Sequence, residues 1–152
     1  MLSSLISEIL ASAAERAREK GLTYQGALLP QEAYALLQKA PGARLIDVRT
    51  RAEFDYVGRI PGSVEIEWQA YPGGHPNKTF LAELRAQVDK EALVMFICRS
   101  GARSHAAAEA AVGAGYTQAY NVLEGFQGDK DSERHRDTIG GWRVAGLPWY
   151  QG

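Results

Sequence analysis

Short apolar runs alternate with helical patterns along most of this chain. The segments with the length and apolar content of β-strands are 22–28, 44–49, 64–68, 92–97 and 119–123. Helical spacing of apolar residues is found between them, at 31–39, 51–56, 80–88 and 102–114. The run at 92–97 is continuously apolar, which is typical of a strand buried on both faces of a parallel sheet. The pattern predicts an α/β domain with an open, parallel, five-stranded sheet and helices on both faces.

The first twenty residues have a different pattern, that of one amphipathic helix over residues 2–20 that ends near Gly21. Its apolar positions recur at helical spacing: Leu2, Leu5, Ile6, Ile9, Leu10, Ala13 and Ala17. We therefore divide the chain into a helical extension (1–21) and a single domain (22–152). The polar face is not predominantly basic, so we expect packing against the domain, or a homodimer through this helix, and no membrane association.

Composition narrows the possible functions. The 17 basic and 18 acidic residues give a net charge of −1, which predicts neither a nucleic-acid nor a membrane partner. No apolar run approaches the roughly 20 residues that span a bilayer, and residues 1–20 lack the pattern of a secretory signal. A single cysteine excludes an intramolecular disulfide. We expect a cytoplasmic protein.

The single cysteine, Cys98, follows directly after the apolar strand at 92–97. A free cysteine is often simply buried, but ligands of open α/β sheets bind beyond the carboxyl ends of strands. The small residues Ser100, Gly101 and Ala102 allow a tight turn whose N–H groups converge on an anion. The next helix contributes its N-terminus, and Arg99 and Arg103 contribute positive charge. These features favour a thiolate nucleophile beside an anion-binding loop.

Several motifs in their order along the chain resemble those of the rhodanese family, the single-domain sulfurtransferases. They are Leu45-Ile46-Asp47-Val48-Arg49 with Glu53-Phe54, Gly58-Arg59-Ile60-Pro61-Gly62-Ser63, Cys98-Arg99-Ser100-Gly101-Ala102-Arg103-Ser104, Asn121-Val122-Leu123-Glu124-Gly125-Phe126, and Gly141-Trp142 with Ala145-Gly146-Leu147-Pro148. The resemblance covers residues 22–149 and implies a rhodanese-like sheet preceded by the amphipathic helix. It implies Cys98 as the catalytic residue and 99–103 as the substrate-binding loop.

The resemblance also implies a reaction, in which Cys98 takes sulfur from thiosulfate or a similar donor as a persulfide and passes it to a thiol or cyanide. With no second cysteine to resolve the persulfide, the acceptor must be another molecule. Phosphatases and arsenate reductases of this fold have a loop one residue longer than the spacing from Cys98 to Arg103, which makes them a less favoured alternative. A persulfide carrier that passes sulfur to a partner protein, with little turnover of thiosulfate, remains a second alternative.

Other residues are predicted to support this loop. Arg99 is expected to touch substrate, while Arg103, at a helix start, needs an anionic partner that Asp47 would supply. Asp47, Arg49 and Ser104 are expected to have supporting roles, and Trp68, Tyr71 and Trp142 either rim the pocket or pack in the core. The three histidines are widely spaced, so we expect no metal and no cofactor. The charged segment 129–137 is predicted to be a solvated loop.

Overall fold

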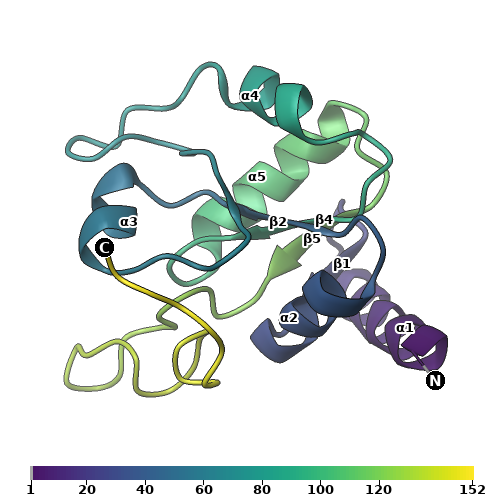
Figure 1. Ribbon diagram of the computed structural model, residues 1–152, viewed down its shortest axis with the longest axis horizontal. Coiled ribbons are helices and arrows are strands. Elements are labelled where there is room, and N and C mark those ends of the chain that lie inside the picture. The colour runs from purple at the N-terminus through teal and green to yellow at the C-terminus, as the bar shows by residue number, and fades with distance from the viewer. Residues whose placement is uncertain (1) are drawn as a thin grey trace.

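A computed structural model describes residues 2–152, and within them the strands form one parallel sheet in the order β1-β5-β4-β2-β3 (Figure 1). The strands are β1 (Gly26–Leu28), β2 (Arg44–Asp47), β3 (Val64–Glu65), β4 (Val94–Ile97) and β5 (Ala119–Val122). The helices are α1 (Leu2–Lys20), α2 (Pro30–Lys39), α3 (Arg51–Tyr56), α4 (Phe80–Gln87) and α5 (Ala102–Gly113). The predicted five-stranded parallel sheet and the N-terminal helix are confirmed.

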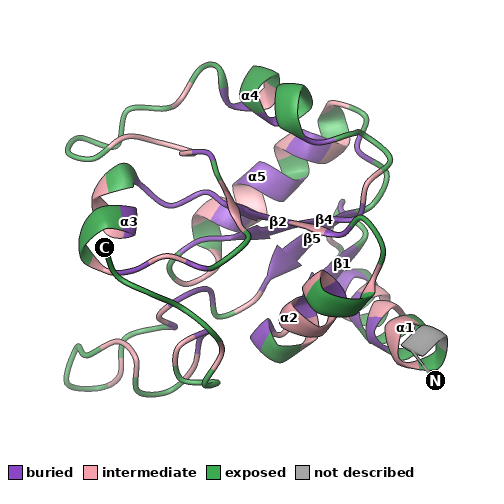
Figure 2. Cartoon of the chain, in the orientation of Figure 1, coloured by how far each residue is buried: buried purple, intermediate pink, exposed green. Residues whose placement is uncertain are grey.

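Helices cover both faces of the sheet and create two apolar cores (Figure 1). On one face, α1 and α2 pack through Ala13 and Leu36 against Leu45 and Met95 of the sheet. On the other face, α4 and α5 pack against Ile46 of β2 and against apolar residues of β4. β4 and β5 are buried over their whole length and are drawn in the colour of buried residues in Figure 2. This burial on both faces explains why β4 is a continuous apolar run.

All five strands are shorter than the sequence pattern predicts, and the difference is largest for β1 and β3. β1 begins only at Gly26, and β3, predicted over 64–68, has two residues at an edge of the sheet. Beyond Glu65 the backbone still donates from Ile66 and Trp68 to the carbonyls of Asp47 and Val48. An edge strand has one neighbour only, and this chain then turns into the long loop before α4, so the regular ladder ends early.

The apolar face of α1 packs within the chain itself. Ile9, Ala13 and Ala17 are buried, and Arg16 donates to the Glu32 carboxylate of α2 at 2.7 and 3.0 Å. Met1, where the predicted extension 1–21 starts, lies outside the described residues. A homodimer through α1 stays a prediction. No helix within residues 2–152 is both long and apolar enough to cross a membrane.

Candidate functional site

Cys98 lies directly after β4, at the carboxyl end of the sheet, and its side chain is buried. Its Sγ accepts a hydrogen bond from the backbone N–H of Gly101 at 3.1 Å and lies 3.3 Å from the hydroxyl of Ser104. Gly101 is the N-cap of α5 and has a φ of 116°, a conformation in which a side chain would be strained. The sulfur is therefore held where the positive end of the α5 dipole stabilises negative charge.

The turn after β5 holds this loop from the side. The N–H groups of Phe126 and Gln127 donate to the carbonyls of Cys98 and Arg99 at 2.8 and 3.0 Å. A Cβ on Gly125 would lie only 2.5 Å from the Arg99 carbonyl, so this close approach requires glycine. The Asn121 amide also donates to the carbonyl of Gly101. The loop has a fixed conformation because a neighbouring strand and turn bind its backbone.

Arg103 has the anionic partner that its place at a helix start requires, but that partner is not the predicted one. The two terminal guanidinium nitrogens of Arg103 donate to the carboxylate oxygens of Glu53, at 2.7 and 3.0 Å. Burial alone would raise the pKa of Glu53, but hydrogen bonds from Arg103 and from Thr50 outweigh burial and hold that pKa at about 2. Glu53 also closes the N-terminal capping box of α3 with Thr50. The Arg103–Glu53 pair thus joins α5 to α3.

Asp47, the predicted partner of Arg103, binds Arg49 instead. The Arg49 guanidinium donates to both carboxylate oxygens of Asp47, the shortest contact being 2.7 Å, and both side chains are fully buried. The guanidinium also lies 4.1 Å from the ring centroid of Phe126. One of its nitrogens, Nη1, has no hydrogen-bond partner within the described chain. The predicted pair of Asp47 with Arg103 is therefore wrong, because Arg49, two residues after Asp47, binds both oxygens of its carboxylate.

Arg99 and Arg103 contribute to a cavity of about 430 Å³ beside the cysteine loop. Its other sides come from α3, through Ala52 and Tyr56, and from the loop after β3, through Tyr71. Burial lowers the pKa of Arg99, and the positive charge of Arg136 adds to this effect. A negative charge on Cys98 would act to raise the pKa of both Arg99 and Arg103, so the sulfur lies within electrostatic reach of the two guanidinium groups.

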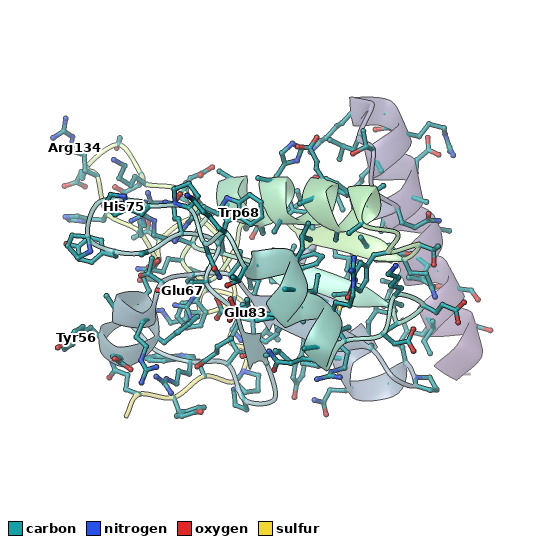
Figure 3. All side chains as sticks on the ribbon, turned by 90° about the horizontal axis from the view of Figure 1, so that it is seen from above. Tyr56, Glu67, Trp68, His75, Glu83 and Arg134 are labelled. Carbon is teal, nitrogen blue, oxygen red and sulfur yellow. The ribbon has the colours of Figure 1, made fainter. Side chains whose placement is uncertain are left out.

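The structure brings one of the three predicted rim aromatics to this cavity. Tyr71 lines it, whereas Trp68 packs edge-on against Phe80 in the core under α4. Trp142 is fully buried against Tyr34 in the opposite core. Of the two roles predicted for these tryptophans, Trp142 therefore has the one in the core, and Trp68 is partly buried against the core. Figure 3 shows Tyr56 projecting from α3 at the end of the molecule that also carries His75.

Three residues near the site were given no role from the sequence. Glu53 was detectable, because Thr50 followed by glutamate three residues later is the signal of a capping box. Asn121 and Arg136 carry no such local signal. Arg136, in the segment predicted to be solvated, is half-buried and donates to the carbonyl of Gly128, whose own N–H binds the Arg99 carbonyl. Within residues 2–152 no group of three or more His, Cys, Asp or Glu side chains is placed to hold a metal ion.

The chain belongs to the family of Rhodanese-like domains, whose pattern it matches over residues 29–132. Among solved structures, the crystal structure of Rv0390 from M. tuberculosis is similar, with 46% sequence identity and a TM-score of 0.78 over 86% of this chain and 100% of that one. The solution structure of a polysulfide-sulfur transferase homodimer from Wolinella succinogenes has the same fold. Its identity is 22% and its TM-score 0.57, over 99% of this chain and 89% of that one.

Two relatives are similar at the level of sequence. A protein of Rickettsia conorii called uncharacterized, RC0915, is 34% identical over 124 residues, which cover 78% of this chain and 91% of that protein. The thiosulfate sulfurtransferase GlpE of Pseudomonas savastanoi is 35% identical over 98 residues, or 64% of this chain and 80% of GlpE. The family and the buried Cys98 are consistent with a sulfurtransferase.

Proposed function

We propose that this protein is a thiosulfate sulfurtransferase that carries sulfur on Cys98. The observation that supports it most directly is the contact of the Cys98 sulfur with the Gly101 N–H, at the start of α5 and beside two arginines. These groups favour a thiolate and attract an anionic donor. The similarity to GlpE points to thiosulfate as that donor.

In the first half-reaction the Cys98 thiolate attacks the outer sulfur of thiosulfate. A bond forms between Sγ and that sulfur, the S–S bond of thiosulfate breaks, and its electron pair leaves with sulfite. The product is the Cys98 persulfide anion, so the total charge is unchanged. Gly101 N–H and the Ser104 hydroxyl are the groups placed to bind negative charge on the cysteine sulfur. Arg99 would bind the sulfonate oxygens and the departing sulfite.

The second half-reaction needs an acceptor from outside the chain, because Cys98 is the only cysteine. Cyanide or a thiolate would attack the outer persulfide sulfur, and the electron pair of the broken S–S bond would return to Sγ. This step restores the thiolate and needs no oxidant. A protein thiol is a possible acceptor by the same chemistry.

Intact-mass measurement after treatment with thiosulfate tests the proposal. We expect the wild-type protein to gain the mass of one sulfur atom and to lose it on addition of cyanide. Cys98→Ser should gain nothing and show no turnover, because a hydroxyl is hardly ionised at neutral pH and cannot form a persulfide. Its fold should be intact, since the exchange replaces one small buried atom with another.

Ser12→Ala is a control for the effect of a single small substitution, because it removes a hydroxyl at an exposed position of α1, outside the cysteine loop. It should still gain one sulfur atom. A wild-type protein that shows no adduct would contradict the proposal. A wild-type protein that accepts sulfur but turns over thiosulfate and cyanide negligibly, while loading a partner protein, would favour the carrier function instead.

A further inference from the structure

Tyr24 is a buried tyrosine that binds the start of the helix after the cysteine loop. It lies between α1 and β1 in the chain, is 4% exposed, and belongs to the apolar core beside α5. Its hydroxyl lies 2.7 Å from Nδ1 of His105, and the two rings meet edge to face with centroids 5.4 Å apart. His105 is in the first turn of α5. The pair therefore joins the segment before β1 to the N-terminus of α5.

The hydrogen bond between these two side chains has a favoured direction. In a neutral imidazole one ring nitrogen carries the proton and the other accepts a hydrogen bond. Nε2 of His105 lies 3.5 Å from the carboxylate of Glu109, one turn further along α5. Because a carboxylate can only accept, the proton belongs on Nε2. Tyr24 then donates to Nδ1, and the imidazole ring is held from both sides.

Asn121 of β5 connects this pair to the cysteine loop. It is 3% exposed, and its Nδ2 donates to the carbonyl of Gly101 at 3.3 Å. Burial raises the pKa of Tyr24, and the Asn121 side chain acts to lower it, so the amide lies within reach of the tyrosine hydroxyl. Its Oδ1 is buried and has no hydrogen-bond partner within the described chain. With one end unbound, the orientation of the amide depends on the side chains around it.

These contacts meet at Gly101, the residue whose N–H binds the Cys98 sulfur at 3.1 Å. Glycine rotates more freely than any other residue, so its own conformation does not fix the direction of this N–H. The carbonyl of Gly101 accepts from the backbone N–H of His105 at 3.1 Å and from the Asn121 amide. Holding the carbonyl limits the rotation of Gly101. The direction of its N–H toward the sulfur therefore depends on His105 and Asn121.

Resting on the proposed function, we propose that Tyr24 and His105 are positioning residues for sulfur transfer. They hold the first turn of α5 and the Asn121 amide, and through these the Gly101 N–H that stabilises negative charge on Cys98. Their side chains bind each other and not the sulfur. Loss of the bond between them should make the thiolate less stable while the thiol stays in place.

The pH profile of Cys98 alkylation by iodoacetamide tests this role without any sulfur donor. The reagent reacts with the thiolate, so the midpoint of the profile follows ionisation of the cysteine and not the stability of the fold. We expect Tyr24→Phe and His105→Ala each to move the midpoint upward by about half a pH unit, as for a weakened hydrogen bond to an anion. Arg99 and Arg103, the charged groups that act on Cys98, are unchanged in both variants.

His105→Asn is the conservative variant. Its amide can accept the hydrogen bond from Tyr24 but cannot carry a positive charge. A profile equal to that of the wild type would show that the bond matters and that a charge on the imidazole does not. A midpoint shifted as far as in His105→Ala would overturn the role of the bond.

Tyr116→Phe is the matched control for Tyr24→Phe. Tyr116 is also a buried tyrosine, 2% exposed, and its hydroxyl donates to the carbonyl of Val88 at 2.7 Å, beyond the end of α5 that is far from the cysteine loop. The control should lower the free energy of unfolding as Tyr24→Phe does and leave the midpoint unchanged. An equal shift in both variants would assign Tyr24 a structural role only.

The double variant Tyr24→Phe with His105→Ala tests whether the two residues act as one unit. Its midpoint should move no further than in either single variant, because both remove the same bond. Shifts that add, or no shift in His105→Ala, would overturn the proposal. The imidazole is 40% exposed, so His105→Ala gives this answer even if Tyr24→Phe does not fold.

The outcomes separate this proposal from the proposed function. A wild-type protein that gains no sulfur from thiosulfate would contradict the proposed function, whatever the alkylation profiles are. Normal sulfur loading, with the midpoint unchanged in Tyr24→Phe and in His105→Ala, would overturn the positioning role alone.

Discussion

Two pairs of arginine and carboxylate lie under the cysteine loop, and they differ in what they connect. Asp47 and Arg49 are two residues apart at the end of β2, and neither side chain is exposed. Glu53 and Arg103 are fifty residues apart, and each side chain is 17% exposed. The first pair stays within one segment, whereas the second joins α3, beside the cavity, to α5, which carries the loop.

The two pairs are expected to have different roles, one in the stability of the domain and one in the positioning of side chains. A fully buried ion pair must stay complete, because removing one partner leaves a charge without solvent. A partly buried pair between two helices contributes less to stability, but it fixes how the helices lie. We expect the Asp47–Arg49 pair to determine mainly whether the domain folds, and the Glu53–Arg103 pair to determine mainly the geometry around Cys98.

The largest effect is expected for Arg49→Met, which leaves the Asp47 carboxylate buried without a partner. The free energy of unfolding should fall by about 3–5 kcal/mol, measured by urea denaturation. The double variant Asp47→Asn with Arg49→Met should be less destabilised than Arg49→Met alone, because it removes the unpaired charge. A double variant at least as unstable as the single one would contradict this role of the pair.

A smaller effect on stability is expected for Glu53→Gln, about 1–2 kcal/mol at pH 7, because the pair is only partly buried. The pKa of Glu53 is about 2 in the folded protein, below its unfolded value of about 4.3. Its contribution is therefore complete above that unfolded value and is lost as the pH falls toward 2. The difference in stability between wild type and Glu53→Gln should shrink over this range.

Glu53→Gln also tests whether Glu53 positions Arg103, because Arg103 without this carboxylate no longer has a fixed place in the cavity. We expect kcat/KM for thiosulfate:cyanide transfer to fall about tenfold while Cys98 still forms its persulfide. Activity is measured at pH 7, where the variant is folded, so that a loss of kcat/KM cannot come from unfolding. Unchanged kinetics would assign Glu53 a structural role only.

The smallest effect is expected for Arg16→Met, which breaks the pair between α1 and α2. Its two side chains are 26% and 19% exposed, and we expect a loss of about 1 kcal/mol. Sulfur transfer should be unaffected, because α1 lies at the opposite end of the molecule from α3 (Figure 3). A loss of activity at a temperature where the variant is folded would show coupling between α1 and the site.

The sequence predicted the helices and strands of the fold closely, but it predicted the contacts between them incompletely. The bounds predicted for α3, 51–56, are the observed ones, because Gly58 breaks the helical pattern soon after Tyr56. The strand at 64–68 was overpredicted, because its alternating pattern does not reveal that it lies at an edge. For Trp68 and Trp142 the sequence left two roles open, at the rim of the pocket or in the core, since an aromatic side chain has the same sequence pattern in both places.

What the sequence alone determined is local: a strand that ends at Cys98, small residues that turn, and a helix that begins beside the sulfur. These follow from periodicity and turn chemistry within a few residues. Only the tertiary structure decided that Glu53 binds Arg103, that Asp47 binds Arg49, and that Tyr71 rather than either tryptophan borders the cavity. Those contacts depend on how distant segments meet in space, which spacing along the chain does not specify.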